Sequence, residues 1–193
     1  DPKPVSGGPA SRWARKSGLV GAVHGYMTVV VHPRFSENRW IYFSYTKPAG
    51  EANGAMAVAR ARLDGGVMSD VRDVFVGENL QGVISVAITP DGMLWLATSG
   101  GDAQDPKSLG GKVLRLKDDG TVPADNPFVG KEGYRPEIYS LGHRSPMGLT
   151  IHPTTKEVWL AEMGPNGGDE INIVRAGRNY GWPLVSLGRT YPG

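Results

Sequence analysis

The sequence predicts an all-β protein built from the repeated four-stranded blades of a β-propeller. Glycine and proline account for 28 and 15 of the 193 residues, and they are spread along the chain without a fixed period, which favours many tight turns over long helices. A strand, a proline turn and a second strand carrying a tryptophan recur three times. Short strands that repeat at a regular spacing are typical of propellers.

The first half of each repeat is predicted to be a β-hairpin. An apolar strand leads into a turn that contains proline, which cannot donate to a strand ladder, and a second apolar strand follows. The turn prolines Pro33, Pro90 and Pro153 stand 57 and 63 residues apart. The hairpins pair Val29–Val31 with Trp40–Phe43, Val86–Ile88 with Leu94–Ala97, and Leu149–Ile151 with Val158–Ala161.

Further strands complete each repeat. The first continues with Ala55–Leu63 and Asp73–Val76 on either side of an Asp-Gly-Gly turn, the second with Lys112–Leu116, and the third with Glu170–Val174. We therefore expect three blades, at about residues 20–80, 81–140 and 141–193. Propellers close with about 4–8 blades. We accordingly expect a fragment of a propeller, whose open blade faces other protein chains would cover.

Composition and charge exclude several classes of function. The formal net charge is only +2, which gives no electrostatic footprint for nucleic acid. No apolar run approaches the ~20 residues of a membrane-spanning helix. Cysteine is absent, so disulfides, thiolate metal sites and cysteine nucleophiles are excluded. The sequence also contains no phosphate-binding loop, dinucleotide fingerprint, zinc-protease motif or nucleophile elbow.

Five motifs in order carry a resemblance to a known family. His32–Trp40 is similar to H-P-x-F-x-x-N-R, and Gly111–Leu116 with Asp119–Phe128 to G-K-[IV]-L-R-[IL] and D-G-[ST]-[IV]-P-x-D-N-P-F. Leu141–Leu149 resembles G-H-R-N-P-Q-G-L, Glu162–Asn172 resembles E-[HQ]-G-P-x-G-G-D-E-[IL]-N, and Gly177–Pro183 resembles G-x-N-Y-G-W-P. These are the motifs of the soluble sugar dehydrogenases that depend on pyrroloquinoline quinone (PQQ).

The resemblance implies a six-bladed propeller with the cofactor at one face, of which this chain would hold about half. It implies oxidation of an aldose at C1, with PQQ and Ca²⁺ as cofactors and a small-molecule sugar as substrate. It also implies a periplasmic or secreted location.

The resemblance assigns roles to particular residues. Arg144 would contact the quinone and take part in catalysis, with Ser145 and Asp169 also at the cofactor. The carbonyls of Gly164 and Pro165 would bind the calcium that bridges to the quinone. Glu170 and Tyr180 would form a second calcium site, and hard oxygen ligands suit that ion.

Several positions depart from the family pattern, which leaves a second function open. The family's histidine base aligns with Gln81, whose amide cannot accept a proton at physiological pH. Other polar family positions are replaced by Val23, Ser145, Met147 and Met163. The alternative is therefore a catalytically degenerate propeller that acts as a binding or structural subunit. His24, next to Val23, is a candidate substitute base.

The remaining polar and aromatic residues have structural interpretations. His32 and His152 occupy equivalent turns, which they are expected to stabilise, and His143 is expected to pack locally. Trp40, Trp95 and Trp159 are predicted to lie between blades. Lys112 and Arg115 are predicted to form the solvated face of a strand. The aspartates at 102, 105, 118, 119 and 125 are expected to cap turns.

Overall fold

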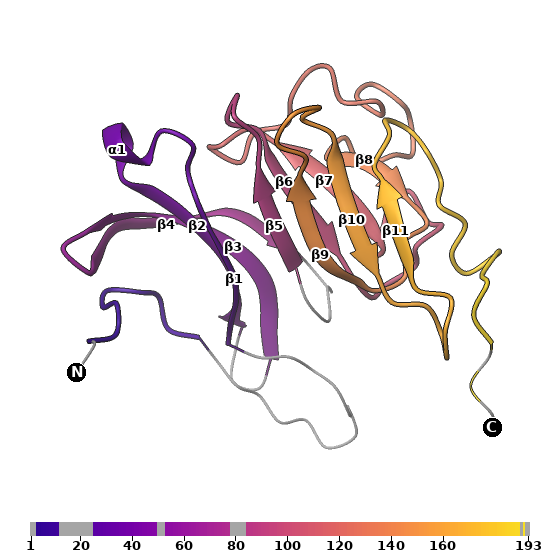
Figure 1. Cartoon of the computed structure of the whole chain (residues 1–193), viewed down its shortest axis with the longest axis horizontal. Coiled ribbons are helices and arrows are strands. Elements are labelled where there is room, and N and C mark those ends of the chain that lie inside the picture. The colour runs from indigo at the N-terminus through magenta and orange to yellow at the C-terminus, as the bar shows by residue number, and fades with distance from the viewer. Residues whose placement is uncertain (1–2, 12–24, 50–52, 78–83, 190, 192–193) are drawn as a thin grey trace.

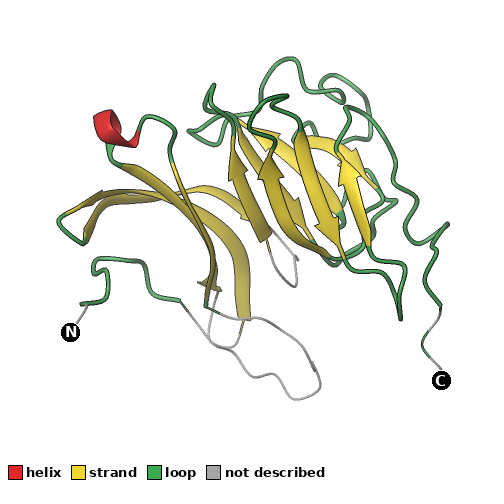
Figure 2. Ribbon diagram, in the orientation of Figure 1, coloured by secondary structure: helices red, strands yellow, loops and turns green. Residues whose placement is uncertain are grey.

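The computed structural model describes residues 3–11, 25–49, 53–77, 84–189 and 191, and it confirms the all-β propeller class. In that part of the chain, eleven strands form three antiparallel sheets that stand side by side (Figures 1 and 2). The helix α1 (Phe35–Asn38) lies in the turn after the first strand. No helix among the described residues has the length and apolar character needed to cross a membrane.

Each sheet is a meander in which every strand pairs with the next strand along the chain. The first sheet has the order β1 (Tyr26–Val31), β2 (Trp40–Ala49), β3 (Asn53–Asp64), β4 (Val67–Gly77). The second has the order β5 (Ile84–Ile88), β6 (Leu94–Thr98), β7 (Lys112–Leu116), β8 (Ile138–Leu141). The third has β9 (Pro146–Ile151), β10 (Val158–Glu162) and β11 (Glu170–Ile173) among the described residues.

The first strands of the three sheets lie next to one another. Strand β5 contacts β1 on one side and β9 on the other, while the later strands spread outward (Figure 1). This is the arrangement of propeller blades around an axis, with the first strand of each blade innermost. The loops at either end of the sheets are thereby brought together on two opposite faces.

Apolar side chains fill both spaces between the sheets. Tyr42, Val58, Leu96 and Leu114 belong to the cluster between the first and second sheets. Between the second and third sheets, Trp95 packs in a cluster with the following residues of both: Ala87, Ala97, Val113, Val158 and Leu160. All five residues of β6 are buried, because its sheet is covered on both faces.

The structure corrects the prediction for Lys112. Its side chain is completely buried, and its ammonium donates to the carbonyls of Asp102 and Gly110, both at 2.8 Å. Lys112 and Arg115 are three residues apart on β7, so their side chains point to opposite faces of the sheet, and both faces are covered. Arg115 is partly buried and pairs with Asp125 at 3.0 Å.

Most structural interpretations of the other residues are confirmed. His32 Nδ1 accepts the backbone N–H of Arg34 at 3.0 Å, and His152 Nδ1 that of Thr155 at 3.0 Å, so both histidines stabilise turns. Trp95 lies between sheets as predicted. Trp159 lies on the face of β10 opposite Val158 and Leu160, beside His152, and that face has no neighbouring sheet among the described residues, so its prediction stays untested.

Several strands are longer than predicted, and one strand was missed; β2, for example, runs to Ala49 rather than Phe43. Strand β4 begins at Val67 rather than Asp73, and its pairing with β3 contains two register irregularities. Strand β8 was not predicted, because it follows a long link from β7 in which turns hide any periodic pattern.

Candidate functional site

The predicted site residues gather at one end of the third sheet. The segment 142–145 before β9, the loop 163–169 between β10 and β11, and the segment after β11 approach one another there. They enclose a polar cradle of about 20 Å³, room for roughly one water or ion. The lining includes Arg144, Glu162, Gly164, Pro165, Glu170 and Tyr180.

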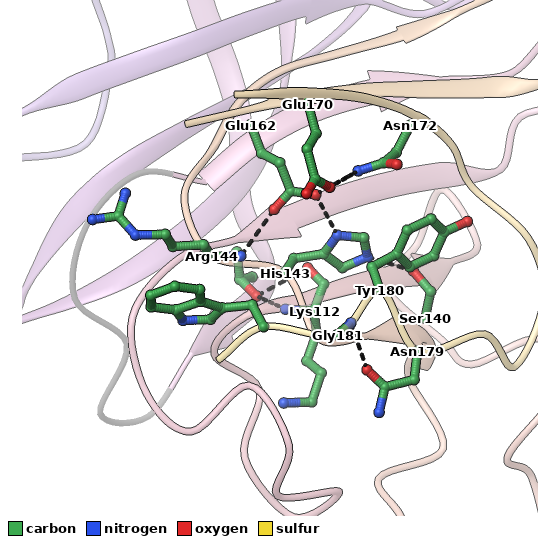
Figure 3. A network of polar contacts seen from close by, with 12 residues as sticks. Lys112, Ser140, His143, Arg144, Glu162, Glu170, Asn172, Asn179, Tyr180 and Gly181 are labelled. Carbon is green, nitrogen blue, oxygen red and sulfur yellow. Dashed lines mark hydrogen bonds and ion pairs between the residues drawn. The ribbon is translucent and has the colours of Figure 1, made fainter. Parts of the chain in front are cut away.

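A buried histidine–carboxylate pair supports the cradle (Figure 3). His143, with no exposed surface, has its Nδ1 2.9 Å from Glu162 Oε1 and its Nε2 2.9 Å from Ser140 Oγ. An ionised carboxylate can only accept, so Nδ1–H donates to Glu162, and Nε2 shares a hydrogen bond with the Ser140 hydroxyl, which can act as donor or acceptor. The imidazole also stacks on the Tyr180 ring at 4.6 Å between centroids. The position of the His143 ring and the proton on its Nδ1 are therefore fixed.

Glu162 is the centre of this network. Besides His143, its carboxylate accepts from the backbone N–H of Arg144 at 2.9 Å and from the side-chain amide of Asn172 at 2.9 Å. Burial alone would raise the pKa of Glu162, but the contact with His143 and the other hydrogen bonds outweigh it and lower the pKa below its ordinary value. The same Asn172 amide donates to Glu170 Oε2 at 2.9 Å, so one amide joins two carboxylates.

Arg144 is partly buried at the mouth of the cradle. Its guanidinium donates to the carbonyls of Met163 and Gly164, at 3.0 and 3.1 Å, and to the hydroxyl of Tyr191 at 3.3 Å. It lies 5.2 Å from the centre of the Trp182 ring. A fixed cation with one face on an aromatic ring is a suitable anchor for a carboxylate or quinone oxygen.

The loop between β10 and β11 is tightly folded around its glycines. A Cβ atom at Gly164 would lie 2.2 Å from the Gly167 carbonyl oxygen, so only glycine fits there. Asp169 accepts the backbone N–H of Gly164 at 3.0 Å and thereby holds the turn, and it does not line the cradle. Ser145 accepts the backbone N–H of Met163 through its carbonyl at 3.0 Å, which ties this loop to the segment before β9.

The oxygen donors of the cradle fit calcium chemistry. The lining includes Gly164 and Pro165 together with Glu162 and Glu170, and carbonyl and carboxylate oxygens are the hard ligands that calcium prefers. Within the described residues no group of three or more acidic or histidine side chains is placed to hold a metal ion, so any ion here depends on backbone oxygens. The Gly164 carbonyl, one of the predicted ligands, accepts from Arg144 in this structure.

Among the described residues, Tyr180 and Met163 line the cradle without offering it a side-chain ligand. The side chain of Tyr180 points to the end of β11, where its hydroxyl donates to the Ile173 carbonyl at 2.6 Å. Met147 and Met163 are about half exposed and offer no polar group to a ligand. Gln81, Val23 and His24 lie outside the described residues.

Sequence reasoning missed Glu162 and Asn172 as a supporting pair. Both were present in the quoted motif, at its first and last positions, but their link to His143 depends on the register of β10. That register pairs Glu162 with Glu170 on β11 and Leu160 with Asn172. A charged residue at a buried position of an otherwise apolar strand was the available signal.

Comparison with known proteins gives consistent matches over nearly the whole chain. A family model described as Glucose / Sorbosone dehydrogenase matches residues 2–193. The aldose sugar dehydrogenase YliI of Escherichia coli strain K12 is 38% identical over 203 residues, covering 98% of this chain and 52% of that protein. The chain therefore spans about half the length of the relatives it matches.

Two solved structures show the same fold. The apo-form of the soluble aldose sugar dehydrogenase from Escherichia coli matches with a TM-score of 0.80 and 36% identity, covering 93% of this chain and 56% of that one. The PQQ-bound form of aldose sugar dehydrogenase from Streptomyces coelicolor matches with a TM-score of 0.73 and 29% identity, covering 87% of this chain and 51% of that one.

Proposed function

The chain belongs to the glucose and sorbosone dehydrogenase family, and we propose that it contributes to a PQQ- and calcium-dependent oxidation of an aldose at C1. In this proposal, residues of about 20–80, 81–140 and 141–193 are three blades of a six-bladed propeller. The observation that carries it is Arg144, a fixed cation beside an oxygen-lined cradle of one-ion size.

Each described residue of the site would have a defined task. Arg144 would bind an oxygen of the quinone, which when bound supplies the hydride acceptor for sugar oxidation. Glu162 would hold Arg144 and His143 in place through the hydrogen bonds described above. The carbonyls of Gly164 and Pro165 would bind the calcium near the quinone, and Glu170 and Tyr180 a second one. Ser145 and Asp169 would hold the surrounding loops at the cofactor.

A second candidate function is binding without turnover. It is favoured by Met147 and Met163, which stand exposed where relatives with the motif carry polar side chains. Gln81 at the base position supports it as well, since an amide cannot remove the C1 hydroxyl proton. In that case the chain would be a binding or structural subunit, unless His24 supplies the base. A periplasmic or secreted location is proposed in either case, from the resemblance alone.

One experiment separates these functions. The protein is incubated with PQQ and calcium, passed through a desalting column, and assayed for retained quinone absorbance and for dye reduction by glucose. We expect the quinone to be retained, and Arg144→Ala to reduce retention at least tenfold while Arg178→Ala, a change at an exposed arginine nearby, leaves it unchanged.

The dye assay then decides between turnover and binding alone. Dye reduction by the unmodified chain supports the dehydrogenase. Retention of quinone without dye reduction supports the binding subunit, and in that case we expect Gln81→His to restore dye reduction. Failure of the unmodified chain to retain quinone contradicts both functions, as does full retention by Arg144→Ala.

A further inference from the structure

A second hollow lies on the face of the molecule opposite the cradle. The strands β1 and β5 both end at this face, where the turn that holds α1 and the β5–β6 turn come together (Figure 1). A groove of about 460 Å³ lies between these turns and the end of β7. Its polar lining residues are His32, Arg34, Asp91, Lys117 and Asp118. The groove is formed by the first and second sheets alone, so it is independent of the predicted cofactor site.

His32 directs a donor toward this groove. Its Nδ1 accepts from the backbone N–H of Arg34 at 3.0 Å and from the amide of Asn38 at 2.8 Å, and both of these groups can only donate. The ring proton of the neutral imidazole therefore lies on Nε2. The residue is only 3% exposed, and Nε2 faces Gly92, where an added Cβ would lie 3.9 Å away. Among the described residues, none forms a hydrogen bond with Nε2.

Although most of the His32 residue is buried, its Nε2 atom is not one of the fully enclosed unpaired polar atoms of the described chain, so it opens to the groove and can donate to an acceptor there. Two cations flank it in the groove lining, Arg34 and Lys117, and within the described part of the chain the Lys117 ammonium forms no ion pair. Three donors around one opening favour an oxyanion.

The two carboxylates of the groove determine which chemical groups the rest of the ligand can have. Asp118 lies 3.9 Å from the Arg60 guanidinium, which also donates to its carbonyl at 3.2 Å, so its negative charge is partly offset. Asp91 and Asp118 can accept hydrogen bonds from hydroxyl groups but would repel a second anionic group. The volume lies within the range of ordinary small-molecule sites, about 300–1,000 Å³.

We propose that this groove binds a small hydroxylated organic anion. Its phosphate or carboxylate group accepts from His32 Nε2 and lies between Arg34 and Lys117, and its hydroxyl groups donate to Asp91 and Asp118. The site is separate from the proposed dehydrogenase chemistry and does not depend on it.

The test is a binding titration of the full chain with four probes: glucose 6-phosphate, D-gluconate, inorganic phosphate and glucose. Calorimetry at 0.1 M NaCl gives the affinities, and histidine ¹⁵N spectra report which imidazole is contacted. We expect glucose 6-phosphate or D-gluconate, or both, to bind about tenfold more tightly than inorganic phosphate and than glucose. Inorganic phosphate lacks the hydroxylated carbon chain, and glucose lacks the anionic group. The Nε2 signal of His32 moves on binding, and that of His152 does not.

Variants make the assignment specific. His32→Asn keeps a turn acceptor, because the asparagine Oδ1 takes the place of Nδ1, but it removes the Nε2 donor. We expect it to weaken binding at least tenfold. His152→Asn makes the same change in the equivalent turn of the third sheet, where Nδ1 accepts from Thr154 and Thr155, and leaves binding unchanged. Lys117→Met weakens binding without touching either turn.

The two anions also distinguish a phosphate ligand from a carboxylate ligand by their relative affinities. The proposal is overturned if all four probes bind equally, if glucose or inorganic phosphate binds as tightly as the hydroxylated anions, or if His32→Asn and Lys117→Met both leave binding intact. Should His32→Asn not fold, the spectra of the unmodified chain and the Lys117→Met variant decide the question alone.

Discussion

At the residue scale, the buried ionisable residues Glu162 and Lys112 are stabilised in different ways. Glu162 is held as a carboxylate by three donors from two elements. Lys112 has only carbonyl oxygens as hydrogen-bond partners, and burial lowers the pKa of its ammonium to about 8. The two residues therefore affect stability in opposite pH ranges.

Lys112 makes the free energy of unfolding rise with pH above neutrality. The folded chain releases this proton near pH 8, while the unfolded chain retains it to about 10.5, so stability increases between these values by roughly 3 kcal/mol. We expect Lys112→Met to remove this rise, as measured by urea unfolding at pH 7.5 and 10. Lys107→Met, at an exposed lysine, serves as the control and should keep the rise.

Glu162→Gln is expected to destabilise the chain by about 2–4 kcal/mol at pH 7, because a neutral amide replaces a buried carboxylate that accepts three hydrogen bonds. The folded pKa of Glu162 is lowered, so its stabilisation is present above about pH 4.5 and lost as the pH falls through the folded value. The difference in melting temperature between parent and variant should therefore shrink in acid. An equal loss for the exposed Glu132→Gln variant would contradict this account.

At the element scale, the β10–β11 hairpin carries most of the candidate site. Its pairing places Glu162 opposite Glu170, and Gly164 and Pro165 of the short loop between them line the cradle. A hairpin that brings two carboxylates together is electrostatically unfavourable unless a donor or a cation lies between them. The Asn172 amide is such a donor, and a calcium ion would be such a cation, with a stronger attraction for both carboxylates.

Calcium is therefore expected to raise the melting temperature of the protein, and Glu170→Gln to abolish that rise. The physical reason is that ligand binding to the folded state adds its free energy to stability. Scanning calorimetry with calcium or with a chelator measures the effect, and Glu132→Gln is the matched control at an exposed carboxylate. A rise of equal size in the Glu170→Gln variant would make this carboxylate a partner of Asn172 only.

Elements with repeated, alternating patterns were predictable from the sequence, and those that depend on tertiary pairing were not. The hairpins around Pro33, Pro90 and Pro153 follow from local turn chemistry and apolar alternation. The burial of Lys112 does not, because periodicity separates two faces without saying that both are covered. The contact between His143 and Glu162 also escaped prediction, because it joins residues that only strand register brings together.

At the scale of the whole molecule, the outer face of the third sheet is apolar, and no other sheet of the described residues covers it. Ile171 is 74% exposed there, opposite Ala161 on β10, which is also exposed, and Trp159 lies on the same face. The opposite face of this sheet packs on the second sheet through Val158 and Leu160. An exposed apolar sheet face favours association.

We expect the chain alone to self-associate, and Ile171→Lys to shift it toward monomer. Sedimentation velocity over a range of protein concentrations measures the change. Val129→Lys, at a half-exposed valine in the link between β7 and β8, is the control and should leave association unchanged. If the unmodified chain sediments as a single monomeric species, this face does not drive self-association.

The meander order of the sheets bears on how the chain is made. Because each described sheet uses strands that are consecutive in the sequence, its ladder hydrogen bonds can close soon after its own residues leave the ribosome. The first sheet then offers its apolar side to the second, and the second to the third, in the order of synthesis. Assembly of this kind is vectorial: each finished sheet is the template for the next, and the growing edge is always the most recently made.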